Sequence, residues 1–336
     1  MSLDVTAPVI EAQNLSKRFI KTVDLAGRIA ARLGAGEGEE VVHAVDNVSL
    51  TVSKGEVVGL VGESGCGKST LGRMIADLMT PTEGNVFFKG CDRENLTSQD
   101  AKAARLAVQM IFQDPYASLN PRMRVEAIIG EAPLAHGLVT RSELADYIAD
   151  VMQRVGLDPE LRKRYPHQFS GGQRSRIGIA RALAVKPEFL VCDEAIAALD
   201  VSIQAQIINL FMDLRETLDL TYLFISHDLG VVEHISDRIV IMYLGRIVEM
   251  APAAELFAAP NHPYAQALLA EVPRLGRVKR DFKPIEGEIP SPLDPPPGCH
   301  FHPRCPHAFQ RCREQAPALK EIAPGRLAAC HLNDAA

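Results

Sequence analysis

The sequence predicts an α/β fold built on a buried parallel sheet that carries a phosphate-binding loop. Short apolar runs alternate with amphipathic helical stretches through the first 270 residues, which is typical of this class. The runs at 189–192 and 222–225 show no polar alternation, as expected of strands buried on both faces. Residues 62–69 fit the pattern G-x-x-x-x-G-K-[ST], directly after an apolar run at 57–61 and before a helical stretch.

Hydrophobic spacing predicts the other regular elements. Apolar residues recur at helical intervals in three stretches. Helices are therefore expected at 69–79, 144–155 and 203–214. Two apolar runs, 238–243 and 246–250, flank Leu244 and Gly245, and this arrangement predicts a β-hairpin.

Two segments interrupt the pattern. Residues 21–40 contain four glycines and are expected to form a surface excursion. A helix that faces a membrane surface or a partner is the alternative, because Leu25, Ile29 and Leu33 are spaced four apart. Residues 273–298 contain seven prolines and no long apolar run, which predicts a linker or an extended strap.

Composition excludes several classes of protein. A net charge of −6 disfavours a chain whose main role is to coat nucleic acid. The 47% hydrophobic and 23% charged residues are ordinary for a globular protein of one large or two smaller domains. The sequence has no apolar run of about 18 residues and no signal segment at its start, so we expect a cytosolic chain that does not itself cross a membrane.

The glycine-rich loop is expected to bind nucleotide phosphates. Its glycines let successive backbone N–H groups converge on phosphate oxygens, and the following helix adds its positive N-terminal end. Lys68 is expected to reach the β- and γ-phosphates, and Ser69 to hold Mg²⁺. The predicted nucleotide-binding residues of this loop are Gly62, Glu63, Ser64, Gly65, Cys66, Gly67, Lys68, Ser69 and Thr70.

Two adjacent acids end the apolar run at 189–192. Asp193 is placed to bind Mg²⁺ through water, and Glu194 to orient or polarise an attacking water. Alone, the pair would be read as solvated acids at a strand end. In company with the phosphate loop, it is the expected magnesium and water site.

A second phosphate-binding corner is predicted at Ser170, Gly171, Gly172 and Gln173, before a helical stretch. One nucleotide does not need two such corners from one chain. We therefore expect two chains to pair head to tail, each offering this corner to the ATP of the other. A simple turn with an N-cap is the alternative.

Together these motifs resemble the ATP-binding subunits of ABC transporters. They occur in that family's order: the loop at 62–69, Gln113 within 112–115, the signature at 170–173, Asp193, Glu194, Asp200 and His227. The resemblance implies that Gln113 senses Mg²⁺ and water and couples to membrane subunits, that Asp200 lies at the dimer seam, and that His227 contacts the γ-phosphate. It also implies that Phe19 stacks on adenine; a core-packing role is the alternative, because the insertion at 21–40 lengthens its distance from the loop.

Further segments resemble the oligopeptide/dipeptide importer branch, and more specifically its second, F-type ATPase subunit. They are residues 116–121, 164–168, 262–264 and 295–299. One departure follows Glu194, where the family usually has Pro-Thr-Ser and this chain has Ala195, Ile196 and Ala197. Because both carboxylates are retained, hydrolysis is expected to survive, while this turn lacks the hydroxyls that would make the family's usual polar contacts.

Four cysteines gather near the end of the chain: Cys299, Cys305, Cys312 and Cys330. In a reducing cytosol such a cluster indicates metal ligation before disulfides. Thiolate ligands suit iron–sulfur clusters or zinc, and members of the importer branch carry the same cysteines, in some cases with a [4Fe–4S] cluster. A [4Fe–4S] cluster is expected, with zinc and free thiols as alternatives. Because the tail is far in sequence from every ATP motif, we expect its role to be structural and separate from hydrolysis.

The resemblance implies an ATPase subunit that hydrolyses ATP to power import of di- or oligopeptides. Residues 1–260 are expected to form the ABC ATP-binding domain, with a β-rich N-terminal portion and a helical subdomain at about 114–180, and residues 261–336 a C-terminal extension. The implied partners are a second ATPase subunit, two transmembrane permeases and, indirectly, an extracytoplasmic substrate-binding protein. This places the chain at the cytoplasmic face of the bacterial inner membrane, without nucleic acid.

Two other functions are alternatives to a transporter ATPase. A soluble ABC ATPase of nucleic-acid repair or translation would be expected to carry a second cassette, zinc modules or long coiled coils, and this acidic chain shows one cassette and no sustained heptads. A regulatory protein that binds ATP without turnover would be favoured by loss of Glu194 or His227, and both are present.

Overall fold

The computed structural model describes residues 7–21, 40–270 and 287–335. Its strands are β1 (Ile10–Lys21), β2 (Glu40–Val52), β3 (Val57–Val61), β4 (Glu83–Phe88), β5 (Cys91–Asp92), β6 (Val108–Ile111), β7 (Phe189–Asp193), β8 (Thr221–Ile225), β9 (Arg238–Tyr243), β10 (Arg246–Pro252), β11 (Lys320–Ala323) and β12 (Arg326–Ala328). Its α-helices are α2 (Lys68–Ile75), α3 (Ser98–Ala107), α4 (Pro115–Ser118), α5 (Val125–Ala135), α6 (Leu144–Arg154), α7 (Gly171–Leu183), α8 (Val201–Leu218), α9 (Leu229–Ile235), α10 (Ala253–Ala258), α11 (Pro263–Ala270) and α12 (Gln310–Glu314).

A central eight-stranded sheet organises the molecule, with strand order β11-β12-β10-β9-β3-β8-β7-β6. Strands β6, β7, β8, β3 and β9 run parallel, whereas β10, β12 and β11 join as antiparallel strands at one edge. Every residue of β3, β7 and β8 is buried, as their continuous apolar sequences predict. The predicted α/β class is confirmed.

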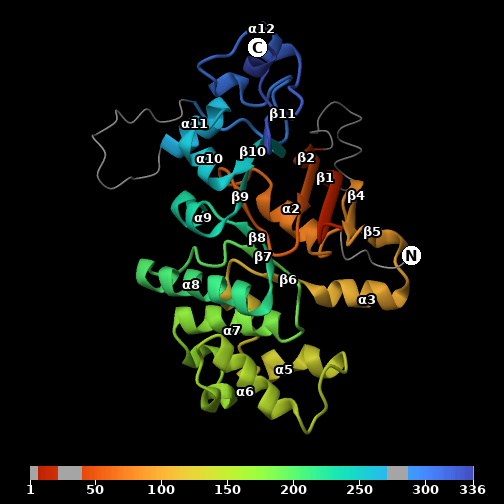
Figure 1. The fold of residues 1–336 in the computed structure, drawn as a ribbon, viewed down its shortest axis with the longest axis vertical. Coiled ribbons are helices and arrows are strands. Elements are labelled where there is room, and N and C mark those ends of the chain that lie inside the picture. The colour runs from red at the N-terminus through yellow and green to blue at the C-terminus, as the bar shows by residue number, and fades with distance from the viewer. Residues whose placement is uncertain (1–6, 22–39, 271–286, 336) are drawn as a thin grey trace, which may run out of the picture.

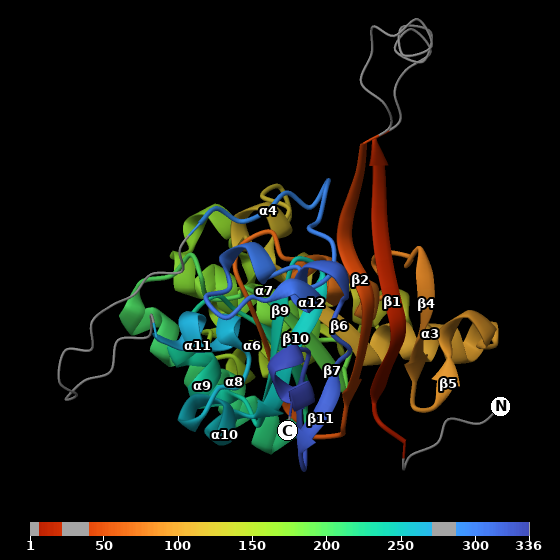
Figure 2. The ribbon, with the colours of Figure 1, turned by 90° about the horizontal axis from the view of Figure 1, so that it is seen from above.

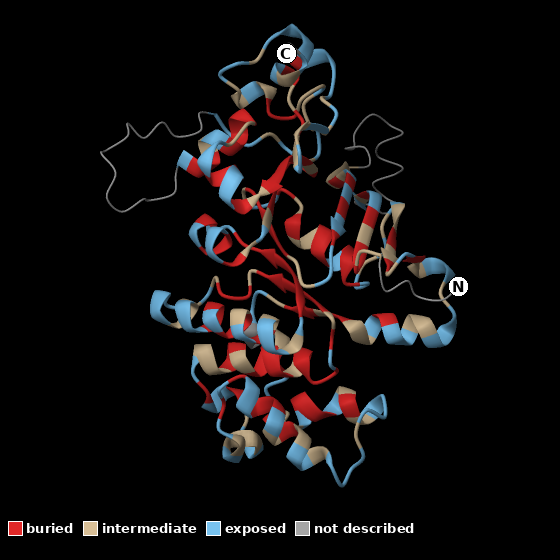
Figure 3. Cartoon of the chain, viewed as in Figure 1, coloured by how far each residue is buried: buried red, intermediate tan, exposed pale blue. Residues whose placement is uncertain are grey.

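The two faces of this sheet are covered by different elements. On β3, Val58 and Leu60 face the apolar cluster that contains α2, while Val57 and Val61 face the cluster that contains α7 and α8. Successive strand residues point to opposite faces, so the helix after the glycine-rich loop and the helix after Ser170 lie on opposite sides of the sheet. Figure 3 shows burial concentrated in the strands of this sheet and in the helix faces that cover it.

A second, antiparallel sheet with order β2-β1-β4-β5 forms the expected β-rich N-terminal portion. Its two long strands stand beside the main sheet, as Figure 2 shows. Most of the glycine-containing insertion between them lies outside the described residues, as do residues 271–286 at the start of the proline-rich segment. The described remainder of that segment, 287–298, forms no helix or strand, and its Pro292 carbonyl accepts a hydrogen bond from the His43 N–H at 3.0 Å.

Helices α5 and α6 lie at the end of the molecule opposite the C-terminal tail, with α7 between them and α8 (Figure 1). The helices expected at 144–155 and 203–214 are present as α6 and α8. The helix expected at 69–79 is shorter, because Asp77 adopts a left-handed φ of 59° and the Leu78 N–H bonds the Arg73 carbonyl at 2.9 Å. This is the geometry of a helix C-terminus, so α2 ends at Ile75.

The predicted hairpin is formed by β9 and β10. Leu244 and Gly245 have φ of 40° and 80°, the positive values that a two-residue type I′ turn requires. The tail continues this edge, since β12 pairs with β10 and β11 pairs with β12. The main sheet therefore contains both the strands that precede the ATP motifs, β3 and β7, and the strands of the cysteine-containing tail, β11 and β12.

Candidate nucleotide-binding site

The loop from Gly62 to Ser69 connects β3 to α2, as predicted. Two of its glycines have no substitute: a Cβ at Gly62 would lie 2.2 Å from the Met242 carbonyl oxygen, and one at Gly67 would lie 2.1 Å from that of Ala44. Gly67 also has a left-handed φ of 104° and precedes the first helical residue. Close packing against two strands thus fixes the path of the loop.

Lys68 is enclosed by the loop that precedes it. Its side chain is buried, and its ammonium donates to the Gly62 carbonyl at 2.7 Å and to the Glu63 carbonyl at 3.0 Å. Ser64 and Gly65 are exposed at the tip of the loop, while Cys66 is buried and burial raises the pKa of its thiol. The ammonium therefore lies inside the curve of the loop.

Ser69 and Asp193 meet directly although 124 residues separate them. The Ser69 hydroxyl donates to Asp193 Oδ1 at 2.7 Å. Asp193 ends the buried strand β7 and is 2% exposed, and burial raises the pKa of its carboxyl group. A hydroxyl and a carboxylate are oxygen ligands of the kind that Mg²⁺ prefers, so these residues fit the predicted magnesium site.

Two residues predicted to act in hydrolysis, Gln113 and His227, converge on one carboxylate oxygen of a third, Glu194. Gln113 Nε2 donates to Glu194 Oε2 at 2.7 Å, and His227 Nδ1 lies 3.5 Å from the same oxygen. The Glu194 side chain is 16% exposed and that of His227 is 60% exposed. The cluster is thus open on one side, next to the pair formed by Ser69 and Asp193.

The backbone of Glu194 is strained, which the sequence did not reveal. Its φ of 47° lies in the left-handed region that non-glycine residues rarely adopt. Its N–H donates to the Ile225 carbonyl at the end of β8, at 3.0 Å, and this bond helps to hold the conformation. Strain of this kind concentrates at functional sites.

The departure at residues 195–197 has a packing explanation. Ile196 is 3% exposed and belongs to the apolar cluster beneath α8. The turn is closed by backbone bonds, with the Ala197 N–H donating to the Glu194 carbonyl at 3.1 Å, and Gln204 Nε2 donates to the Ile196 carbonyl at 3.2 Å. In this chain the turn is thus held by backbone hydrogen bonds and by the burial of Ile196, in place of side-chain hydroxyls.

The signature residues sit at the start of α7. Ser170 caps the helix: its hydroxyl accepts the Gln173 N–H at 3.3 Å, and Gln173 Oε1 accepts the Ser170 N–H at 3.0 Å. Ser170 is exposed, and the helix packs on the face of the sheet opposite α2. The geometry shows the N-cap and is also compatible with the predicted phosphate-binding corner. A capped helix N-terminus keeps the partial positive charge that attracts a phosphate.

Two other predicted residues lie on the surface. Phe19, on β1, is 40% exposed, so the core-packing alternative is wrong for it, and the Lys17 ammonium lies 5.5 Å from its ring centroid. Asp200 is exposed at the residue before α8. Thr70 lies in the first turn of α2 and is half-buried.

The tail cysteines lie within electrostatic reach of one another. Burial raises the pKa of Cys299 to about 11, and the thiols of Cys312, Cys330 and Cys305 add to this shift. The Cys299 N–H also donates to the Cys312 carbonyl at 2.8 Å. Within residues 7–21, 40–270 and 287–335, however, no three or more His, Cys, Asp or Glu side chains are arranged to hold a metal ion, so the iron–sulfur cluster stays a prediction.

The tail contacts the phosphate loop directly, through residues that the sequence analysis missed. Arg304 forms an ion pair with Glu63 at 2.8 Å, and the Tyr264 hydroxyl accepts the Glu63 N–H at 2.9 Å. The fold therefore returns the tail to the loop although the two are far apart in the sequence, and the expectation that the tail's role is structural and separate from hydrolysis stays a prediction. The sequence did contain an indication of this contact. Glu63 places a negative charge within a phosphate-binding loop, and such a charge is expected to have a cationic partner.

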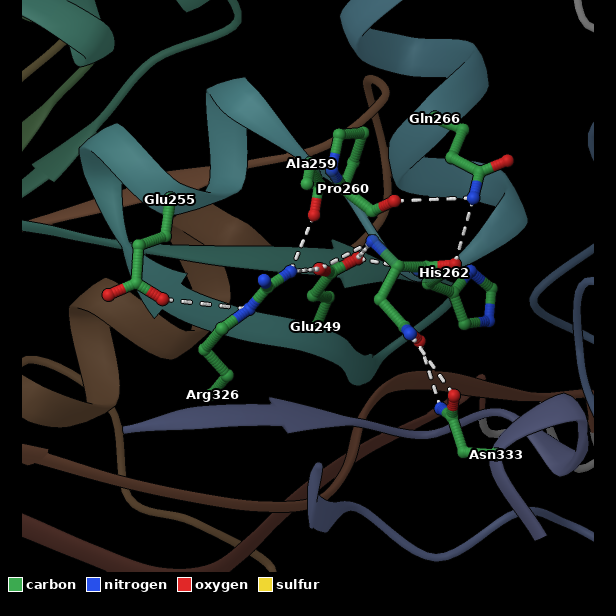
Figure 4. Close-up of polar contacts among 9 residues, drawn as sticks. Glu249, Glu255, Ala259, Pro260, His262, Gln266, Arg326 and Asn333 are labelled. Carbon is green, nitrogen blue, oxygen red and sulfur yellow. Dashed lines mark hydrogen bonds and ion pairs between the residues drawn. The ribbon is translucent and has the colours of Figure 1, made fainter. Parts of the chain in front are cut away.

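A buried carboxylate, Glu249, holds the segment that carries Tyr264. Glu249 is fully buried on β10, and burial raises the pKa of its carboxyl group. It accepts the N–H groups of Asn261 at 2.8 Å and His262 at 2.7 Å, and Arg326 from the tail lies 3.7 Å away (Figure 4). These bonds fix the start of α11.

Among the described helices, none combines the length and the apolar character needed to span a bilayer.

Comparison with known proteins identifies two family models. Residues 45–197 match the ABC transporter model, and residues 248–312 match the model of the oligopeptide/dipeptide transporter C-terminal region. The chain is 54% identical over 295 residues to the oligopeptide transport ATP-binding protein AppF of Bacillus subtilis (strain 168), covering 87% of this chain and 90% of that protein. It is 51% identical over 294 residues to the probable peptide ABC transporter ATP-binding protein y4tS of Sinorhizobium fredii (strain NBRC 101917 / NGR234), covering 87% of this chain and 83% of that protein.

A solved structure shares the fold. The dimeric post-hydrolysis state of the ATP-binding cassette MJ0796, bound to ADP and Pi, aligns with 73% of this chain and 98% of that chain. The TM-score is 0.61 and the sequence identity is 27%.

Proposed function

Because the chain belongs to the ATP-binding subunits of ABC transporters, in the oligopeptide/dipeptide branch, we propose that it hydrolyses ATP to power the import of peptides. The observation that carries this proposal is the convergence of Gln113, Glu194 and His227 beside the pair formed by Ser69 and Asp193. A phosphate loop alone would support only nucleotide binding. A positioned carboxylate next to it supports hydrolysis.

The residues have distinct roles in the proposed reaction. Water attacks the γ-phosphorus in line, and the bond to the bridging oxygen of ADP breaks as the new P–O bond forms. Glu194 orients and polarises that water, with Gln113 holding the carboxylate. Lys68 exchanges its bonds to loop carbonyls for bonds to the β- and γ-phosphates, and His227 contacts the γ-phosphate.

Ser69 and Asp193 would hold Mg²⁺, Asp193 through water, and Gln113 would lie close to it. When bound, the ion neutralises charge on the phosphate oxygens. The adenine base is assigned to Phe19, whose exposed ring is available for stacking. The remaining contacts to phosphate come from the backbone of residues 62–70.

We propose a head-to-tail dimer of ATPase subunits. The exposed Ser170 corner starts a helix on the face of the sheet opposite α2, so it is better placed to serve another chain's nucleotide than its own. Gly171, Gly172 and Gln173 belong to that corner. Asp200 is exposed and follows Leu199, whose side chain would lie 3.8 Å from a Cβ at Gly171, and we assign Asp200 to the dimer seam. The similar cassette MJ0796 was solved as a dimer.

The assembly proposed here includes two transmembrane permeases and, indirectly, an extracytoplasmic substrate-binding protein. The domain division is 1–260 for the ATP-binding domain and 261–336 for the extension, with the helical part at about 114–180 facing the permeases. Helices α5 and α6 of this part lie at the end of the molecule opposite the tail (Figure 1). Gln113, which binds Glu194, directly precedes the helical part in the sequence and so connects it to the site. The chain would then be peripheral, at the cytoplasmic face of the bacterial inner membrane.

A metal centre at Cys299, Cys305, Cys312 and Cys330 is also proposed, as [4Fe–4S] with zinc as the alternative. Its support is the gathering of four cysteines between residues 299 and 330 of the sequence, in a tail whose described part has few large buried residues. The described positions do not form a ligand set, so binding would require the thiols to close around the ion or cluster. Such binding would cross-link the tail.

Purification of the chain from detergent-solubilised membranes tests the assembly. We expect two hydrophobic permeases and a second ATPase to be recovered, with ATPase activity that rises when a peptide-loaded binding protein is added. A Lys68→Ala variant is the matched control, since it should recover the same partners without ATPase activity. Recovery of nucleic acid in place of permeases would support the soluble alternative and contradict this function.

A further inference from the structure

An arginine of the C-terminal tail forms an ion pair with the phosphate-binding loop. Arg304 Nη1 donates to Glu63 Oε2 at 2.8 Å, and Nη2 donates to Oε1 at 3.0 Å, so the two groups form a bidentate pair. The Arg304 side chain is 5% exposed and that of Glu63 is 21% exposed. The bidentate geometry is specific, and in a pair this buried the removal of one partner leaves the other charge uncompensated, which costs more than breaking a surface ion pair.

Each polar group of Glu63 is bound by a different part of the chain. Its N–H donates to the Tyr264 hydroxyl on α11, its carbonyl accepts from the Lys68 ammonium, and its carboxylate accepts from Arg304. Residue 63 is therefore the point at which the loop is anchored to the C-terminal part of the molecule. The neighbouring backbone N–H groups depend on this anchor for their direction.

The charge of Glu63 makes the arginine necessary. An unpaired carboxylate in this loop would repel a triphosphate, and the bidentate guanidinium neutralises that charge. Loss of Arg304 would release the anchor and also leave a bare negative charge beside the nucleotide. Both effects weaken ATP binding.

The tail's own fold sets the position of Arg304. The residue ends a short 3₁₀ helix, His302–Arg304, and directly precedes Cys305. The preceding Phe301 is buried, with ring centroids 5.3 Å from Tyr243 and 5.4 Å from Tyr264. The guanidinium also lies 3.4 Å from the Tyr243 hydroxyl. The packing of Phe301 against two tyrosines thus positions Arg304 beside the loop.

We propose that Arg304 is a positioning residue through which the tail sets the ATP affinity of the loop, acting on Glu63. This inference rests on the proposed ATP-binding function. It assigns the extension a role at the nucleotide in addition to any role in assembly.

The test measures ATP dissociation constants and ATPase kinetics of the purified full chain with Mg²⁺. Arg304→Met is expected to weaken ATP binding roughly 10- to 100-fold, the size of a lost charged hydrogen-bond pair, with kcat at saturating ATP nearly unchanged. Arg304→Lys keeps the charge without the bidentate geometry and should fall between wild type and Arg304→Met. It also keeps the test informative if Arg304→Met folds poorly.

A double variant separates anchoring through Glu63 from general damage to the tail. Adding Glu63→Gln to Arg304→Met removes the carboxylate that Arg304→Met leaves unpaired, so the double variant should bind ATP more tightly than Arg304→Met alone. Arg311→Ala, which breaks an ion pair with Asp334 inside the tail, is the control and should bind ATP like wild type.

Three results would overturn the inference. They are unchanged ATP affinity in Arg304→Met and Arg304→Lys, an equal loss in Arg311→Ala, and a double variant that binds ATP no more tightly than Arg304→Met. If the wild-type chain binds no ATP, the proposed function itself fails, and that outcome is distinct from a wild type that binds ATP while the variants match it.

Discussion

Gln113 and Glu194 share a hydrogen bond of 2.7 Å although 81 residues separate them in the sequence. Gln113 follows β6 and Glu194 follows β7, and these strands are parallel neighbours. Residues that follow adjacent parallel strands emerge at the same edge of a sheet, so topology brings them together. The bond orients the carboxylate, while the left-handed backbone of Glu194 sets its starting point.

Replacing Glu194 by Gln should abolish most turnover while ATP binding persists. The amide cannot accept a proton from water, so ATPase activity is expected to fall on the order of 10²- to 10⁴-fold. Size-exclusion chromatography with ATP should show a trapped dimer of ATPase subunits. Glu216→Gln, at an exposed position of α8, is the matched control. Near-normal turnover in the assembled transporter would remove Glu194 from the mechanism.

Ser170 should act on the nucleotide of the partner subunit. Ser170→Arg places a bulky charge at the exposed N-terminus of α7, on the face of the sheet opposite α2, so hydrolysis at the partner's loop should fail in the proposed head-to-tail dimer. A mixed assembly, with the change in one subunit and single-turnover assays of each site, makes the measurement. Failure confined to the variant's own site would contradict the head-to-tail arrangement.

Ile196→Thr should destabilise the protein. The side chain is 3% exposed in the core, and the change loses apolar burial and buries a hydroxyl, at a cost of about 2 kcal/mol in the free energy of unfolding. Urea unfolding measures it. Ala197→Ser, at the half-buried next position, serves as the control and should have a much smaller effect. Equal stability of wild type and Ile196→Thr would show that the turn accepts the family's hydroxyl.

His262 should make the protein less stable in mild acid. Burial lowers its pKa from its ordinary value to about 4. Between about pH 6.5 and 4 the unfolded chain therefore binds a proton that the folded chain does not, and the free energy of unfolding falls as pH falls, by up to about 1.4 kcal/mol per pH unit.

A His262→Asn variant isolates this contribution. The asparagine can still accept the Tyr264 N–H that His262 Nδ1 accepts at 3.0 Å. Urea unfolding at pH 7 and pH 5 should show a smaller loss in the variant than in wild type. Glu249, whose pKa is raised by burial, is present in both chains and cancels in the comparison. Identical losses would contradict the prediction.

Cys305→Ser should loosen the tail if the thiols bind a metal centre. Anaerobically purified wild type is expected to contain iron, or zinc as the alternative, and the variant to contain less and to be cut faster by protease beyond about residue 273. Cys91→Ser, at a buried cysteine far from the tail, should keep the wild-type metal content. Wild type without iron or zinc, together with equal protease resistance, would refute the centre.

The sequence by itself determined the features that depend on a few consecutive residues. The glycines of the loop at 62–69 and the turn at Leu244 and Gly245 are local backbone requirements, and each was found where the pattern predicted it. The N-cap at Ser170, which was the alternative interpretation of residues 170–173, is local in the same way. Unbroken apolar runs likewise identified β7 and β8. The early end of α2 was missed because Asp77, a residue without a strong helix-stop signal, adopts the left-handed conformation.

Only the tertiary structure decided which distant groups meet. The order of parallel strands brings Gln113 to Glu194, and the antiparallel edge formed by β10 and β12 carries the tail back toward the loop. The pair between Glu63 and Arg304 spans 241 residues, and no local pattern encodes such a contact. It exists because burial of Phe301 against two tyrosines fixes the tail's path, and long-range packing of this kind depends on the whole chain at once.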